Sequence, residues 1–228
     1  MKKKKHLLEL LVIIICMLSV SYLKVQYTWR EGHTQATVVI DAGHGGFDPG
    51  KVAADGSMEK DINLSIACKL RMYLEKQGVH VVMTRTEDAA LGSRGNKSNK
   101  NADMQARIDT INTAGAVCGI SIHQNSFTNA NVRGAQVFYY QGATEAEKLA
   151  LQIQESIKVV LQDSNTRQPK ENTSYYILRK ATCPMVIVEC GFLSHPEESL
   201  LLQEESYQNK LAEGMGKGIL SALRTFEN

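Results

Sequence analysis

Residues 37–46 have the sequence Thr37-Val38-Val39-Ile40-Asp41-Ala42-Gly43-His44-Gly45-Gly46. The β-branched run at the start predicts a buried strand, and the glycines predict a tight turn where the strand ends. A helical pattern follows this turn, because apolar side chains recur every three to four residues on one stripe. The stripe consists of Ile62, Ile66, Leu70, Tyr73 and Leu74. A strand that leads through a turn into an amphipathic helix is typical of an α/β fold.

The alternation of short strands and amphipathic helices continues along the chain. Further strands are expected at residues 79–84, 119–123, 135–140, 175–178 and 185–188, and helices at 104–111, at 144–163 and from about 206. The strand at 185–188 is the most apolar, which places it in the sheet centre. The sequence therefore predicts a single three-layer α/β domain, with a mostly parallel twisted sheet flanked by helices.

Several local signals refine this picture. Gly78 is expected to close the first helix, and Thr144 with Glu147 has the spacing of a capping box. His195 precedes Pro196, which is typical of a residue at a helix entry. Close packing of the last helix is expected at its three glycines, Gly214, Gly216 and Gly218.

Composition excludes some function classes. The 228 residues carry a formal net charge of only +2, and the lysine run at positions 2–5 contributes to this small excess of positive charge. Nucleic acid is therefore disfavoured as the main partner. One Trp, five Phe and eight Tyr are also too few for the stacking platforms of single-strand binders.

The N-terminus has the pattern of an export signal. The lysines at 2–5 precede an apolar run at residues 7–23 in which Glu9 is the only charge. This run predicts a hydrophobic helix that is either a cleaved signal peptide or an uncleaved membrane anchor. We therefore expect an exported, extracytoplasmic protein, with a signal or anchor at 1–24, a linker at 25–36 and a catalytic domain at 37–226.

The cysteines do not indicate a disulfide framework. Of five, Cys16 lies in the hydrophobic segment, and Cys183 and Cys190 are separated by about 23 Å if the residues between them form a strand. Buried free thiols are expected for Cys183, Cys190 and the remaining two, Cys68 and Cys118.

Four residues could carry chemistry. His44, His123 and Glu189 each follow or end a predicted strand, and Glu59 opens the first helix on its apolar stripe. Taken singly, each has a structural explanation: a turn residue, a hydrogen-bonded histidine, an acidic first turn or a buried ion pair. Together they would meet at the carboxyl edge of a parallel sheet. Two histidines with one carboxylate form a zinc set, and a second carboxylate could carry the proton in a hydrolase.

These residues stand in motifs that resemble a known family. The motifs are residues 38–46, Glu59-Lys60-Asp61-Ile62-Asn63-Leu64, Ser121-Ile122-His123-Gln124-Asn125-Ser126 and Val188-Glu189-Cys190-Gly191-Phe192-Leu193-Ser194, with Met83-Thr84-Arg85 between the second and third. In this order they resemble the zinc-dependent N-acetylmuramoyl-L-alanine amidases of the Amidase_3 family over residues 37–224. The short chain is most similar to the CwlD-type branch, which is specific to sporulation and germination.

The resemblance implies roles for the four residues. His44, Glu59 and His123 would bind Zn²⁺, and Glu189 would be the catalytic carboxylate. The substrate would be peptidoglycan, cut between the lactoyl group of N-acetylmuramic acid and L-alanine. In that branch the reaction contributes to muramic lactam formation in spore cortex. No autoinhibitory helix is expected between Val82 and Cys118, so a regulatory partner protein is one possible means of control.

Other assignments stay open at this stage. Asn125 and Arg107 are candidates for contacting substrate or for bracing the site. Two alternatives to the amidase are a peptidoglycan-binding module without catalysis and a zinc peptidase or deacetylase that acts on another cell-wall bond.

Overall fold

The structure is a computed structural model that describes residues 14, 15, 17, 19, 36–92 and 99–226. The chain divides into two units, Met1–Gln35 and Ala36–Asn228, and the second contains the folded domain. The predicted N-terminal helix and linker fall almost wholly outside the described residues, so their boundaries stay predictions. No helix within the described part is both long and apolar enough to cross a membrane.

Six strands form one sheet in the order β2-β1-β3-β6-β4-β5. In chain order they are β1 (Thr37–Ala42), β2 (His80–Met83), β3 (Cys118–Asn125), β4 (Gln136–Tyr140), β5 (Lys170–Asn172) and β6 (Met185–Phe192). The strands β2, β1, β3 and β6 are parallel, whereas β4 runs antiparallel to β6 and parallel to β5. The mostly parallel sheet is confirmed, and β6 lies inside it with every residue buried.

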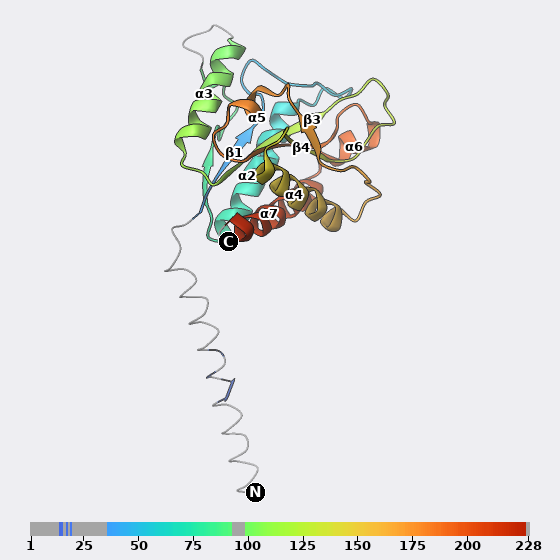
Figure 1. Cartoon of the computed structure of the whole chain (residues 1–228). Helices are drawn as coiled ribbons and strands as arrows, with labels where there is room; N and C mark the ends of the chain where they lie inside the picture. The colour runs from blue at the N-terminus through green and yellow to red at the C-terminus, as the bar shows by residue number, and fades with distance from the viewer. Residues whose placement is uncertain (1–13, 16, 18, 20–35, 93–98, 227–228) are drawn as a thin grey trace, which may run out of the picture. The chain divides into compact units, whose positions relative to one another are not determined.

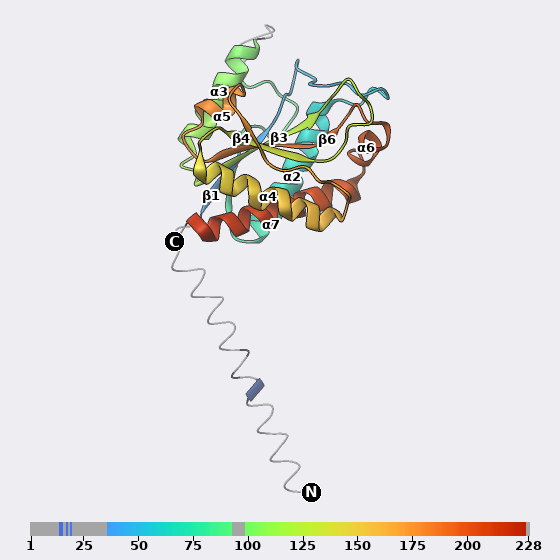
Figure 2. The same ribbon diagram turned by 45° about the vertical axis from the view of Figure 1, so that its right-hand side comes forward.

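Helices cover both faces of the sheet, which confirms the three layers (Figures 1 and 2). On one face, α2 (Glu59–Lys76), α4 (Thr144–Leu161) and α7 (Glu205–Phe226) pack together over a large apolar core. On the other face, α3 (Lys100–Thr113) and α5 (Tyr176–Lys180) cover a smaller core. A short helix, α6 (Pro196–Leu201), follows β6. Because β1, β3 and β6 are parallel neighbours, their carboxyl ends meet at one edge of the sheet.

Two of the three cap and closure predictions are confirmed. Gly78 follows the C-cap of α2 with φ 85°, a conformation that suits glycine. His195 is the N-cap of α6, and its Nδ1 accepts a hydrogen bond from the Glu198 N–H at 3.2 Å. The capping box is wrong, because Thr144 is already the first helical residue. Glu147 instead accepts a hydrogen bond from the Tyr139 hydroxyl.

The strand expected at residues 175–178 is wrong. Residues Tyr176–Lys180 form helix α5, and the edge strand β5 lies earlier, in a polar stretch. Ile177 and Leu178 are adjacent and both buried, because this helix packs against the smaller core. The strand β5 was missed because it pairs only with β4 and buries no apolar side chain.

The four described cysteines are free, as expected. Cys118 and Cys190 are buried, whereas Cys68 and Cys183 are only partly so. No disulfide therefore joins the described cysteines, and the stability of the domain comes from its packed cores.

Helices α4 and α7 pack closely because α7 carries glycines. A Cβ atom on Gly218 would lie 2.5 Å from the Cα of Ile153, and one on Gly214 would lie 2.9 Å from the Cα of Ile157. Real Cβ contacts do not reach such distances, and backbone atoms cannot move aside as side chains do. The predicted close packing at these glycines is confirmed.

We expect Gly218→Ala to lower the free energy of unfolding. Overpacking costs about 1–3 kcal/mol, which exceeds the gain of up to about 1 kcal/mol from better helix propensity. Thermal unfolding should show a melting temperature several degrees lower. Lys210→Ala, an exposed position on the same helix, should change it little. An equal or higher melting temperature for Gly218→Ala would contradict the packing described.

Candidate metal centre and active site

The His44 turn continues directly from β1. Beyond the strand, the Gly43 N–H donates to the Ile122 carbonyl at 3.0 Å and so extends the pairing with β3. His44 then adopts φ 61°, which is uncommon for a residue with a side chain, and Gly45 and Gly46 also have positive φ. This backbone conformation turns the imidazole toward the edge of the sheet, as the sequence predicted.

Glu59 is the first residue of α2 and is only 4% exposed. Its Oε2 accepts a hydrogen bond from the Lys51 N–H at 2.8 Å, and its Oε1 accepts one from the Gln124 N–H at 3.1 Å. The Asn63 amide, one helical turn later, donates to Oε1 at 3.4 Å. Backbone donors therefore fix this carboxylate.

His123 lies near the end of β3 and packs against the backbone of the His44 turn. A Cβ atom on Gly43 would lie 2.3 Å from the His123 ring, so only glycine leaves room for the imidazole there. The glycine before His44 is thus required by the other histidine.

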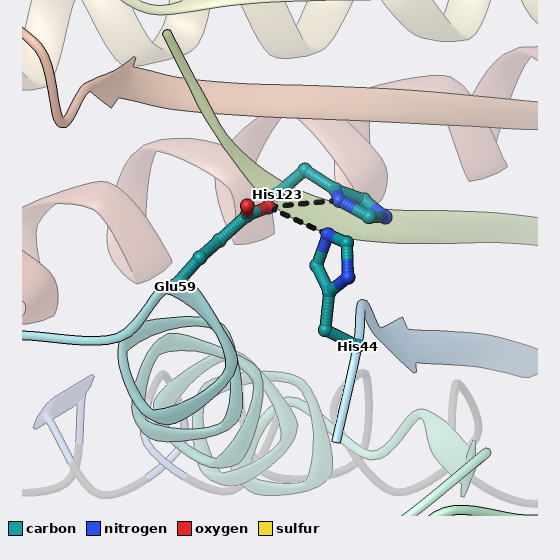
Figure 3. Close-up of side chains that lie close together, drawn as sticks. All are labelled: His44, Glu59 and His123. Carbon is teal, nitrogen blue, oxygen red and sulfur yellow. Dashed lines mark hydrogen bonds and ion pairs between the residues drawn. The ribbon is translucent and has the colours of Figure 1, made fainter. Parts of the chain in front are cut away.

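The three side chains converge on one point (Figure 3). His44 Nε2 lies 3.2 Å and His123 Nδ1 lies 3.0 Å from Glu59 Oε1, and one ligand atom of each residue lies within 4.8 Å of the others. Around a tetrahedral ion with bonds of about 2.0 Å, ligand atoms lie about 3.3 Å apart. The spacing and the two nitrogens with one oxygen fit a divalent cation such as zinc.

The charges of the cluster also favour a cation. Burial disfavours the imidazolium of His44, but the Glu59 and Asp48 carboxylates outweigh burial and raise the pKa of His44. Burial likewise opposes ionisation of Glu59, yet its interactions with His123 and His44 hold the pKa of Glu59 well below its usual range. Asp48 Oδ2 accepts from His44 Nδ1 at 3.0 Å, so the carboxylate fixes the ring with Nε2 toward the cluster.

Glu189 lies beside this cluster. It is the strand partner of His123 across the β3–β6 pair. Its side chain is 7% exposed, and Oε2 accepts no hydrogen bond from any residue that the structure describes. Burial raises the pKa of Glu189, repulsion from Glu59 adds to this, and His123 opposes it. A buried carboxylate with an open acceptor oxygen is suited to take up a proton.

Tyr175 also reaches Glu189, which the sequence analysis missed. Burial and the adjacent Glu189 carboxylate raise the pKa of Tyr175 to about 12, so its hydroxyl keeps its proton and can donate. The ring stacks edge-on against Phe138, with centroids 5.7 Å apart. The incorrect strand at 175–178 hid this placement.

Arg107 braces the site from within. It is 2% exposed. Its Nη1 donates to Asp41 Oδ1 at 2.8 Å and to the Ala42 carbonyl at 2.7 Å, and its Nη2 donates to the His44 carbonyl at 2.5 Å. Of the two roles expected for Arg107, bracing fits this placement. Substrate contact does not, because the guanidinium is buried and turned toward the protein.

Two further buried residues were given no role from sequence. Asp41 receives hydrogen bonds from Thr84 and Ser121 as well as Arg107, and the charge of Arg107 helps to lower its pKa against the effect of burial. Arg85 donates to the carbonyls of Ala42, Gly43, Lys60 and Glu87. A charged residue that directly follows a run of apolar residues, as Asp41 does, is a signal that could have singled out Asp41, although not its partners.

Asn125 ends β3 at the same edge. The pairing with β6 shifts between His123 and Asn125, and the Leu193 N–H donates to the Asn125 carbonyl at 2.9 Å. Its side-chain oxygen accepts from the Ser126 N–H. The side chain is partly exposed, and substrate contact stays a prediction.

The fold and the cluster define a class: an α/β enzyme with a candidate metal site and a buried carboxylate at the carboxyl edge of its sheet. A family model described as N-acetylmuramoyl-L-alanine amidase, Amidase_3, matches residues 38–221. The chain belongs to this family of amidases.

Individual relatives agree with the family. The chain is 37% identical to the germination-specific N-acetylmuramoyl-L-alanine amidase of Bacillus subtilis, over 96% of this chain and 94% of that protein. It is 27% identical to the amidase AmiA of Escherichia coli over 84% of this chain and 77% of AmiA. Among solved structures, it is similar to the CwlD amidase from Clostridioides difficile in complex with the GerS lipoprotein. That match has a TM-score of 0.81 and 37% identity, and it covers 84% of this chain and all of the other.

We expect His44→Ala to lose bound metal, because it removes one of three ligands. Zinc content after dialysis, measured by mass spectrometry of the metal, should fall from near one ion per chain to a small fraction. His80→Ala, which removes an exposed histidine at the far end of β2, should keep full zinc content. Full zinc in His44→Ala would remove His44 from the ligand set.

We expect Arg107→Gln to lower both stability and metal affinity. Breaking a buried ion pair costs about 3–5 kcal/mol, and the His44 backbone loses its brace. Thermal unfolding and zinc titration measure the two effects. Arg71→Gln removes an exposed pair with Glu75 and should change stability by about 0.5 kcal/mol or less. A raised KM with unchanged stability would instead indicate substrate contact.

Proposed function

We propose that the protein is a zinc-dependent amidase that cuts the bond between the lactoyl group of N-acetylmuramic acid and L-alanine in peptidoglycan. The observation that supports this most is the convergence of His44, Glu59 and His123 beside a buried Glu189 with an open carboxylate oxygen. Membership of the amidase family indicates which bond is cut. The protein's residues supply the binding site and the proton carrier.

The proposed reaction gives separate roles to the metal, to Glu189 and to Tyr175. When bound, zinc supplies Lewis-acid chemistry at the lactoyl carbonyl and acidifies the attacking water. Glu189 takes a proton from that water and gives it to the nitrogen of the departing L-alanine, which leaves as an amine. Burial raises the pKa of Glu189, which makes its carboxylate a stronger base than an exposed glutamate. The Tyr175 hydroxyl, which keeps its proton beside Glu189, is a hydrogen-bond donor available to this carboxylate.

The biological setting is part of the proposal. Because a relative with 37% identity is named as germination-specific, we place the reaction in spore cortex modification, where it contributes to muramic lactam formation. Residues 1–24 would direct export as a signal peptide or membrane anchor, residues 25–36 would link, and residues 37–226 would form the extracytoplasmic catalytic domain. The complex of CwlD with a lipoprotein supports a regulatory protein partner for this chain as well.

We expect Glu189→Gln to keep zinc and lose activity. The amide cannot accept a proton, and loss of general acid–base catalysis costs about 10²–10⁴-fold in rate. The assay is mass spectrometry of peptidoglycan digested by the full chain, with zinc and with a chelator. The amidase releases stem peptides that begin with L-alanine, whereas a peptidase or deacetylase releases other products.

The controls separate the parts of the proposal. Gln203→Ala, at an exposed position that bonds Asp55, should leave the rate near that of the native chain. Activity retained in Glu189→Gln would remove Glu189 from the proton-carrying role. Zinc binding without any cleavage by the native chain, with the partner protein added, would favour a non-catalytic binding module.

A further inference from the structure

A cavity of about 360 Å³ opens beside the segment that leads into β4. Two segments line it, residues 131–134 before β4 and residues 163–167 after α4. Because β4 is antiparallel to β6, its first residue, Gln136, is the strand partner of Glu189. The cavity therefore lies at the same edge of the sheet as the proposed metal site, on the side of β4.

Arg167 is held rigidly in the wall of this cavity. Its Nε donates to the Arg133 carbonyl at 2.9 Å, and its Nη1 donates to Gln136 Oε1 at 3.0 Å. Its guanidinium stacks over the Phe192 ring at 4.9 Å, just past Glu189 on β6. The Asn165 side chain also accepts from the Arg167 N–H. The guanidinium is thus fixed between β4 and the end of β6.

The charge of Arg167 is not neutralised within the part of the chain that the structure describes. No ion pair joins Arg167 to a described carboxylate, and its Nη2 donates to no described residue. Asp163 lines the cavity, but its side chain accepts from the Asn165 N–H. Arg133 forms a loose pair with Glu197 at 3.6 Å. The buried Arg107, in contrast, is paired with Asp41 at 2.8 Å.

A fixed, partly buried guanidinium without a counter-charge fits a carboxylate ligand, because its planar donors match two oxygens. If the proposed function holds, the substrate offers such a group close to the cut bond. The second stem residue, D-glutamate, is linked through its side chain and so keeps a free α-carboxylate. The Cα atom that carries this carboxylate lies about 4 Å from the Cα of L-alanine, whose nitrogen is released when the bond is cut. Gln136 accepts a hydrogen bond from Arg167, and its Cα lies about 5 Å from the Cα of its strand partner Glu189.

The geometry points to Arg167 as a specificity-determining residue that binds the free α-carboxylate of the second stem residue. This inference rests on the proposed function for its substrate. It assigns the cavity between residues 131–134 and 163–167 to the peptide, on the leaving-group side of the cut bond. An amidated second residue, D-isoglutamine, would leave Arg167 without its anion.

Two substrates that differ only at this carboxylate test the inference. Matched glycan chains carry stems with either D-glutamate or D-isoglutamine at the second position, and kcat/KM is measured for each. A hydrogen bond to a charged group changes free energy by about 1.5–3 kcal/mol, which is about 10- to 150-fold. The native chain should prefer D-glutamate by that factor, Arg167→Gln should lose the preference, and Arg167→Lys should keep part of it.

The control variant is Arg179→Gln, an exposed arginine at the far edge of the sheet near Met185. It should keep the native preference. Equal cleavage of both substrates by the native chain would overturn the inference, as would a preference that persists in Arg167→Gln. An equal loss of activity on both substrates in Arg167→Gln, with the preference kept, would show that Arg167 only supports the loop.

A binding measurement makes the two proposals separable. Isothermal titration of the zinc-loaded full chain with the dipeptides L-Ala-D-Glu and L-Ala-D-isoGln requires no catalysis. Tighter binding of the first, lost in Arg167→Gln, supports the carboxylate site even if no peptidoglycan bond is cut. Cleavage of both substrates with equal binding of both dipeptides would overturn the site and leave the amidase proposal standing.

Discussion

The candidate site depends on a buried ion pair between Asp41 and Arg107. The pair joins the end of β1 to α3, and both partners are almost completely buried. Burial of two charges costs several kcal/mol per ion, so such a pair is stable only when further hydrogen bonds satisfy it. Thr84 and Ser121 bind the carboxylate, and the carbonyls of Ala42 and His44 accept from the guanidinium. The hydrogen bonds that offset the cost of desolvation therefore also hold the His44 turn in place.

Strand direction explains how distant residues meet. Because β1, β3 and β6 are parallel, His44, His123 and Glu189 all emerge at one edge, although as many as 145 positions separate them in sequence. The antiparallel β4 contributes its amino end to that edge, so Gln136 pairs with Glu189 and the cavity lined by Arg167 lies beside the segment before β4. A reversed strand at this place brings the segment before β4 to the same edge of the sheet, which a parallel strand would not do.

The sequence predicted the sheet, its apolar centre and the meeting of His44, Glu59, His123 and Glu189 at one edge. Hydrophobic periodicity is a local signal, and a motif at a strand end indicates the edge at which its side chains gather. The bracing network escaped because Asp41 and Arg107 are 66 positions apart, and nothing local marks them as partners. The helix at Tyr176–Lys180 was not predicted, because the apolar run at residues 175–178 is too short to distinguish helical from strand periodicity. That error hid Tyr175, whose contact with Glu189 depends on the helix.

Each proposed ligand is positioned by a partner other than the ion. Glu59 is held by the Lys51 and Gln124 N–H groups, His44 by Asp48 and by its braced carbonyl, and the His123 ring by its fit against Gly43. A site assembled in this way needs little reorganisation when a cation binds, so more of the binding free energy appears as affinity. The uncommon φ of His44 carries a conformational free-energy cost. The hydrogen bonds of the Asp41–Arg107 network offset this cost during folding, so it does not reduce the free energy of metal binding.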